Sequence, residues 1–263
     1  MRKRMLLTAG LLVLSMTALG NAQSLSKTTN LQESKIGVTL DLTYVSKWLS
    51  KGVRAYGNKG GLFKTIDLDF YGTGFGIKTT HRNATSGGYV DNQRFDFRPY
   101  YKNCLFEDTA YLTNYNISVG YEYYPGLDRH RANTTYEWIY AFSWPELLPN
   151  GLVPKYIAHY EYPAGSDDNN RKITGWVHRF ILGKNVYVQD FKNPLYLSGE
   201  LAYADGLGGV GHDWAYFTAG ISTKFDITDN ISFVPGLYQQ ISMEDTVNTN
   251  DDTYVQLSMK YKF

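Results

Sequence analysis

The chain ends with Val255-Gln256-Leu257-Ser258-Met259-Lys260-Tyr261-Lys262-Phe263, nine residues that alternate without a break between apolar and polar side chains. Successive side chains of a β-strand point to opposite faces, so this alternation places every apolar side chain on one face and every polar side chain on the other. Such a strand suits a boundary between lipid and water, but it also suits a half-buried strand of a soluble sheet. The rest of the chain decides between these two possibilities.

The opposite end of the chain has the features of an export signal. Basic residues 2–4 precede an apolar run over residues 5–19, and Gly20 and Ala22 supply small side chains where a signal peptidase cleaves. The run is shorter than the roughly 20 residues that a membrane-spanning helix requires. We therefore expect three segments: a signal peptide cleaved near Ala22 (1–22), a short periplasmic N-terminal segment (23–35) and one folded domain (36–263).

The composition is that of an exported, sheet-rich chain. The 263 residues include 23 tyrosines and 25 glycines, and the single cysteine, Cys104, excludes an internal disulfide. The formal net charge is only +1, which offers no electrostatic reason to expect nucleic acid as a partner. Tyrosine is enriched where lipid meets water, with its ring in the apolar layer and its hydroxyl outside.

A two-residue hydrophobic period, interrupted by clusters of turn-forming residues, predicts twelve strands. Links after odd-numbered strands are all long and polar. Of the five links after even-numbered strands, two are tight and three have eight or nine residues, so the alternation expected of an up-and-down barrel with both ends in the periplasm is met in part. Ten is the alternative strand count. The predicted strands are 36–48, 62–70, 75–82, 93–101, 111–124, 134–144, 153–162, 172–184, 194–204, 213–226, 230–241 and 253–263.

Aromatic side chains on the apolar faces favour a membrane over water. The strand over 134–144 presents Tyr136, Trp138, Tyr140, Phe142 and Trp144 on one face with no charge between them. A soluble sandwich or lipocalin would also bury one face, but mainly with aliphatic side chains. Tyrosine and tryptophan near strand ends are typical of the aromatic girdles of a membrane barrel.

The opposite faces of the strands carry charges of both signs. An Arg or Lys facing lipid at the bilayer midplane costs roughly 2 to 4 kcal/mol, so these residues are predicted to line the interior. In the strand over 172–184 this cost directs Arg179 inward, and the tight turn at Gly72 predicts an ion pair between Asp67 and Lys78 on neighbouring strands. The predicted interior residues are Asp41, Asp67, Asp69, Lys78, Arg82, Arg94, Asp96, Arg98, Glu122, Glu137, Lys155, Glu161, Arg179, Glu200, Lys260 and Lys262.

Catalytic and metal-binding motifs are weak. None of the five histidines lies in a sequence resembling the outer-membrane phospholipases or omptin proteases, and His159 beside Glu161 is read as part of a hydrogen-bonded interior. The acidic clusters at 166–170 and 244–252 are read as solvated loop tips, since no further ligand pattern accompanies them. We therefore expect no catalytic residue, no metal and no cofactor.

Two resemblances add to this interpretation. The last strand resembles the closing strand of bacterial outer-membrane barrels, which implies that Tyr261 and Phe263 form a signal for the barrel assembly machinery. Separately, several short segments resemble the TorF family of porins, although this chain has extra residues between Tyr44 and Lys51. The segments are 43–47, Lys51-Gly52-Val53, 67–70, 72–76 and 194–198. That likeness implies a channel of undefined solute and carries over no catalytic residue.

Together these features predict an all-β, transmembrane, up-and-down antiparallel β-barrel of about twelve strands in a bacterial outer membrane. The expected function is passive diffusion of small hydrophilic solutes, with outer-membrane lipid and the assembly machinery as further partners. A plugged structural or adhesion barrel, and a barrel enzyme acting on lipid or peptide, are the alternatives.

Overall fold

A computed structural model describes residues 36–87, 92–125, 134–164 and 174–263. The predicted signal peptide (1–22), its cleavage point near Ala22 and the periplasmic segment (23–35) lie outside the described residues, so they stay predictions. No helix in the described ranges is both long and apolar enough to span a bilayer.

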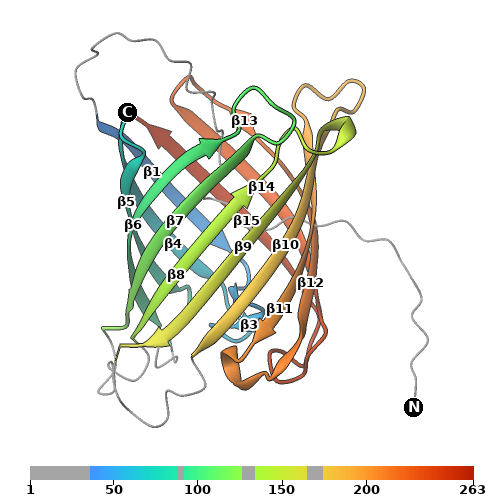
Figure 1. Cartoon of the computed structure of the whole chain (residues 1–263). Coiled ribbons are helices and arrows are strands. Elements are labelled where there is room, and N and C mark those ends of the chain that lie inside the picture. The colour runs from blue at the N-terminus through green and yellow to red at the C-terminus, as the bar shows by residue number, and fades with distance from the viewer. Residues whose placement is uncertain (1–35, 88–91, 126–133, 165–173) are drawn as a thin grey trace.

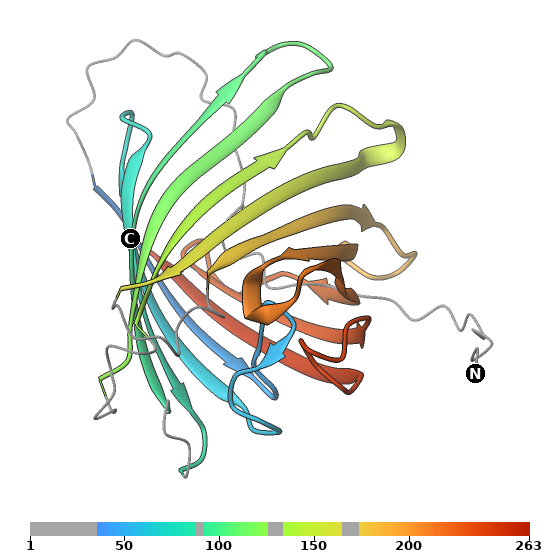
Figure 2. The same ribbon diagram turned by 60° about the horizontal axis from the view of Figure 1, so that its bottom comes forward.

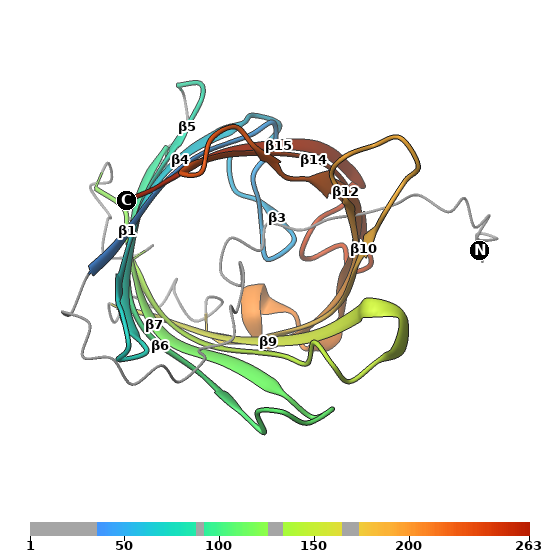
Figure 3. The same ribbon diagram turned by 90° about the horizontal axis from the view of Figure 1, so that it is seen from above.

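Twelve long antiparallel strands close into a barrel, as the sequence predicts (Figures 1 and 2). Each pairs with the next along the chain, and the pairing of β1 with β15 closes the ring seen from above in Figure 3. The strands are β1 (Ile36–Val45), β4 (Gly61–Phe70), β5 (Phe75–Ala84), β6 (Gln93–Leu105), β7 (Thr113–Tyr123), β8 (Thr135–Ser143), β9 (Leu152–Pro163), β10 (Gly175–Val186), β11 (Leu195–Asp205), β12 (His212–Thr223), β14 (Ile231–Ser242) and β15 (Asp252–Lys262).

Shorter elements lie between these strands. They are β2 (Leu49–Ser50), β3 (Val53–Arg54), β13 (Phe225–Asp226) and two short 3-10 turns, η1 (Pro149–Gly151) and η3 (Leu207–Gly209). The predicted strand over 213–226 is therefore interrupted after Thr223, and β13 pairs only with β14.

The tight turn after β4 sets the register of the first hairpin. Gly72 and Gly74 both have φ near +78°, a left-handed conformation that glycine adopts without steric cost. The resulting register pairs Asp67 with Lys78, and Lys78 Nζ lies 3.1 Å from Asp67 Oδ2. The predicted cross-strand ion pair is confirmed.

The two faces of each strand differ in the predicted way. In β8, Tyr136 and Trp138 are more than one-third exposed on the outer surface, whereas Glu137 is only 2% exposed. In β10, Phe180 is exposed and Arg179 Nε donates to Glu200 Oε1 at 2.7 Å, so the arginine faces inward as its desolvation cost requires.

The first strand is shorter than predicted. It ends at Val45 instead of Trp48, and Trp48 is buried. The indole packs edge-on against Phe63 with ring centroids 5.3 Å apart. The prediction was wrong because the two-residue period continues past the last strand pairing, while packing with residues distant in sequence turns Trp48 inward.

Candidate functional site: an inner loop against a charged wall

Residues 46–60, which connect β1 to β4, fold into the barrel; we call them the inner loop (Figure 3). The sequence predicts a long polar external link over 49–61; the link is long, but it folds into the barrel instead of extending from its rim (Figure 3). Backbone hydrogen bonds hold both ends of the inner loop at the barrel wall: Ser46 N–H donates to the Val255 carbonyl and Thr85 N–H to the Gly60 carbonyl, both at 2.9 Å. The loop is therefore part of the interior.

The tip of the inner loop is a tight hairpin between β2 and β3. Lys51 and Gly52 have φ of +49° and +90°. A Cβ atom at position 52 would lie 2.5 Å from Tyr216 Cδ1, so only glycine allows this close approach to β12. Gln240 Nε2 also donates to the Gly52 carbonyl at 2.9 Å. The tip is thus seated against β12 and β14.

Lys51 extends from this tip to the wall formed by β8 and β9. Its Nζ atom lies 2.9 Å from Glu137 Oε1 and 2.9 Å from Glu161 Oε1. Burial by itself would lower the Lys51 pKa, but the carboxylates of Glu137 and Glu161 outweigh burial and raise it well above its usual range. The ammonium group is therefore charged at neutral pH and bridges the loop to the wall.

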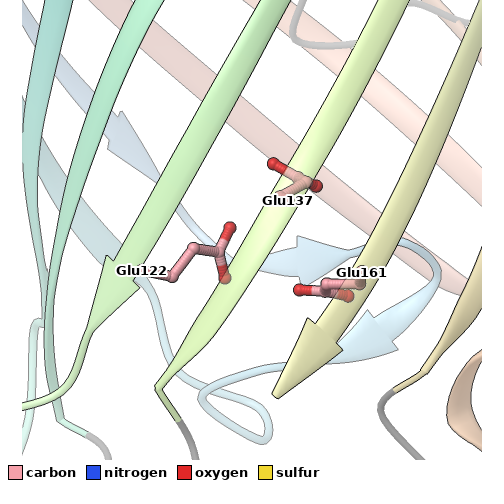
Figure 4. A group of neighbouring side chains, drawn as sticks. All are labelled: Glu122, Glu137 and Glu161. Atoms are coloured by element: carbon pink, nitrogen blue, oxygen red, sulfur yellow. The ribbon is translucent and has the colours of Figure 1, made fainter. Parts of the chain in front are cut away.

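Glu122, Glu137 and Glu161 lie on three successive strands and point toward one another (Figure 4). Oxygen atoms from the three carboxylates lie within 4.8 Å of each other, close enough to share one cation. The Lys51 ammonium lies against two of them, while guanidinium groups contact the cluster at 2.6 Å: Arg94 contacts Glu122 and Arg98 contacts Glu137. The protein's own cations thus compensate the acidic cluster.

A second anchor holds the loop to the closing strand. The side chain of Asp252, the first residue of β15, is fully buried and accepts from Lys47 Nζ at 2.8 Å and from Arg54 Nε at 2.7 Å. Asn248 Nδ2 also donates to Asp252 Oδ2 at 3.0 Å. The sequence assigned Asp252 to a solvated loop tip, which was wrong because three donors from elsewhere in the chain compensate its burial.

Aromatic contacts also hold the inner loop in place. The guanidinium carbon of Arg82 lies 5.3 Å from the Trp48 ring centroid and that of Arg94 lies 5.0 Å from it. Tyr56 is 1% exposed and meets Trp48 edge-on at 4.6 Å. Cation–π contacts gain strength where water is excluded, so they favour this inward position of Trp48.

Known proteins were compared with this chain at the levels of sequence and structure. No protein-family profile matches the chain, and no curated protein matches its sequence. Among solved structures, the NanC porin aligns with a TM-score of 0.53 at 10% identity, covering 85% of this chain and all of the porin. The chain has the fold of an outer-membrane β-barrel.

Two further barrels match more loosely. An outer-membrane channel from Pseudomonas putida F1 has a TM-score of 0.48 at 10% identity, over 87% of this chain and 94% of that one. The outer membrane phospholipase A from Escherichia coli has a TM-score of 0.42 at 12% identity, over 89% of this chain and 93% of that one. With TM-scores below 0.5 and identities this low, these two barrels carry no conclusion about this chain.

Within the barrel, the predicted interior residues fall into two groups. One group surrounds the inner loop and is joined by ion pairs: Arg82, Arg94, Asp96, Arg98, Glu122, Glu137, Glu161, Arg179 and Glu200. The other lies toward the end of the barrel where the chain terminates: Asp41 with Lys260, Asp67 with Lys78, Asp69 with Lys102, and Lys155 beside the Tyr196 hydroxyl. Lys262 is exposed near the end of β15.

Sequence reasoning missed the charged residues of the loop itself. Lys47, Lys51 and Arg54 stand within eight residues of one another, each able to pair with an inward carboxylate. That basic spacing, opposite a wall rich in glutamate, is the one signal that could have identified the inner loop.

His159 belongs to the same network. Its Nδ1 atom lies 2.9 Å from Glu137 Oε1, and its Nε2 atom lies 3.3 Å from Arg179 Nη1. Both ring nitrogens thus have protein partners, and no hydroxyl or thiol in the described ranges hydrogen-bonds the ring. These two contacts fix the orientation of the His159 imidazole in the charged wall of the barrel.

Proposed function

We propose that the mature chain is an outer-membrane channel for small hydrophilic solutes and that the inner loop forms its narrowest part. The observation that carries this proposal is the bridge from Lys51 to Glu137 and Glu161, which fixes a loop across a polar lumen. Twelve strands form a barrel between those filled by side chains and those with a broad aqueous pore. A loop in such a lumen has a strong effect on what can pass.

The charged interior supports transport of polar solutes. A lumen lined by paired charges of both signs solvates polar groups without a large net field, so we expect weak selectivity between cations and anions. Rings of unpaired charge would instead exclude ions of one sign. The resemblance to the TorF porins points in the same direction, because those proteins are also expected to be channels.

The proposed orientation places both chain ends in the periplasm. The C-terminus and the β2–β3 hairpin lie toward opposite ends of the barrel (Figure 1), so the inner loop would narrow the pore near the cell surface. Solutes that enter from outside would then meet the inner loop first.

Single-channel recording of the refolded protein in planar bilayers tests the proposal. Wild type should give small, weakly selective currents. Lys51→Glu places a fourth carboxylate beside Glu122, Glu137 and Glu161, so repulsion should displace the loop, raise the conductance and shift selectivity toward cations. Lys224→Glu is the matched control, since Lys224 pairs with Asp226 at an exposed position.

Currents that are absent from both wild type and Lys51→Glu, where a control porin conducts, would refute the channel. That result would favour the plugged structural barrel, in which the same loop serves as a permanent closure.

A further inference from the structure

A lysine lies on the outer face of the barrel. Lys64 is exposed on the same row of β4 as Leu62 and Ile66, and the register places it beside Leu42 of β1. In the described part of the chain no carboxylate lies within ion-pair distance of it. A cation on this face costs about 2 to 4 kcal/mol at the bilayer midplane and about 0 to 1 kcal/mol near the interface, so an anionic partner would stabilise it.

A second nitrogen group lies next to Lys64. The register pairs Lys64 with His81 of β5, so both side chains point outward. The imidazole stacks on Phe95 of β6, with ring centroids 4.4 Å apart and planes only 9° from parallel. Its Nε2 atom is buried without a hydrogen-bond partner among the described residues. Stacking fixes the ring beside Lys64, and an oxygen acceptor that displaced the atoms covering Nε2 would supply the partner that this nitrogen lacks.

An apolar groove runs beside these two groups. Its volume is about 690 Å³, and Lys64 and His81 both line it. The outward residue Thr79 is small and lies between Ile66 and Phe97 in the register, which leaves room along the surface. The other outward lining side chains are mainly hydrophobic: Leu40, Leu42, Ile66, Phe97, Met259 and Tyr261.

We propose that this groove binds one phosphorylated lipid of the outer leaflet, of the lipid A class. A phosphate group would accept from Lys64 and His81, and an acyl chain would lie against Ile66 and Phe97 over Thr79. Charge complementarity and the apolar lining select an amphiphile of this kind, because a lone phosphate would leave the groove empty and a neutral lipid would leave the lysine unpaired. The inference rests on the proposed location and orientation of the barrel, which place Lys64 toward the outer surface.

Native mass spectrometry of the detergent-refolded protein tests this site with three probes: diphosphoryl lipid A, dephosphorylated lipid A and phosphatidylglycerol. Wild type should retain one diphosphoryl lipid A in preference to the other two. Lys64→Glu should weaken that binding roughly tenfold through loss of a charge-assisted hydrogen bond and introduction of repulsion. The control is Lys184→Glu, because Lys184 also lies on an outer row, paired with Leu197, but near the other end of its strand.

Thr79→Trp provides a second variant that keeps both nitrogen groups and fills the groove; it should also weaken binding. Heat-modified migration on gels identifies the folded fraction of each variant. Equal retention by Lys64→Glu and Lys184→Glu, equal binding of dephosphorylated lipid A, or stronger binding of phosphatidylglycerol would overturn the proposal. Lipid retention is measured without any current, so a failed channel and a failed lipid site give different results.

Discussion

Arg54 and Asp252 form a bidentate ion pair although 198 residues separate them in the chain. Arg54 Nε donates to Oδ2 and Nη2 to Oδ1, both at 2.7 Å, and the Asp252 side chain is fully buried. One partner comes from the tip of the inner loop and the other from the first residue of the closing strand. This pair couples the position of the loop to the closure of the barrel.

Asp252→Asn should loosen the inner loop. The change removes the carboxylate from Arg54 and Lys47 together, and removing one member of a buried ion pair costs about 3 to 5 kcal/mol. We expect trypsin to cleave the refolded variant within the loop faster than wild type, as followed by mass spectrometry of the fragments. Asp226→Asn, which removes the same charge from an exposed pair with Lys224, should digest like wild type. Equal loop cleavage in all three proteins would contradict the anchoring role of Asp252.

The conductance should be insensitive to moderately alkaline pH. The pKa of Lys51 is raised above its ordinary value of 10.5, because the attraction of Glu137 and Glu161 outweighs burial. A raised folded-state pKa means that the stabilising contribution is complete below the ordinary pKa and is lost only as pH rises through the higher folded-state value. Single-channel conductance should therefore be constant from about pH 7 to about pH 9.5. A conductance that increased within that range to the value of Lys51→Met would show that the lysine loses its proton early.

Glu200→Gln should destabilise the barrel strongly. Glu200 is fully buried, receives two hydrogen bonds from Arg179 at 2.7 Å and accepts another from the Tyr216 hydroxyl at 2.9 Å. The amide leaves a buried guanidinium without its counter-charge, so the free energy of unfolding should fall by about 3 to 5 kcal/mol in urea titrations. Lys102→Ala breaks a more exposed pair with Asp69 and should cost about 0 to 1 kcal/mol. If both substitutions lowered the free energy of unfolding by similar amounts, burial would not determine how much these ion pairs contribute to stability.

Phe263→Ser should reduce the amount of assembled barrel in cells. The Phe263 ring meets Tyr261 edge-on at 4.5 Å, and its backbone N–H donates to the Val38 carbonyl at 3.0 Å. The substitution keeps the backbone bond and removes the terminal aromatic group that the assembly machinery is expected to recognise. Heat-modified migration of membrane fractions measures the folded fraction, with Lys262→Ser as the control. If both variants assemble as wild type does, Phe263 is not part of a recognition signal.

Export should remove the first 22 residues. N-terminal sequencing of protein purified from membranes is expected to begin at Gln23, and Ala22→Leu should cause the uncleaved precursor to accumulate because a large side chain blocks the peptidase. A mature protein that begins at Met1 would exclude the predicted signal.

The site was only partly predictable from sequence. Inward placement of Arg179 followed from the cost of a lipid-facing charge, and the pairing of Asp67 with Lys78 followed from a short turn. The first argument uses the alternation of side chains within one strand and the second uses the register of two neighbouring strands, so both depend on local sequence. The partners of Lys51 and Arg54 lie on β8, β9 and β15, so no local pattern links them to the loop.

The sequence by itself determined the twelve strands, their order and which face of each strand meets the interior, because alternation and turn residues act over a few positions. Only the tertiary structure decided where residues 46–60 lie and which charges meet. Closure brings β1 against β15 and encloses a space that distant side chains must fill together. In that space the burial of Trp48 and the pairing of Lys51 with two glutamates hold the inner loop inside the barrel. The polar composition of the loop, taken alone, would predict that it is exposed to solvent.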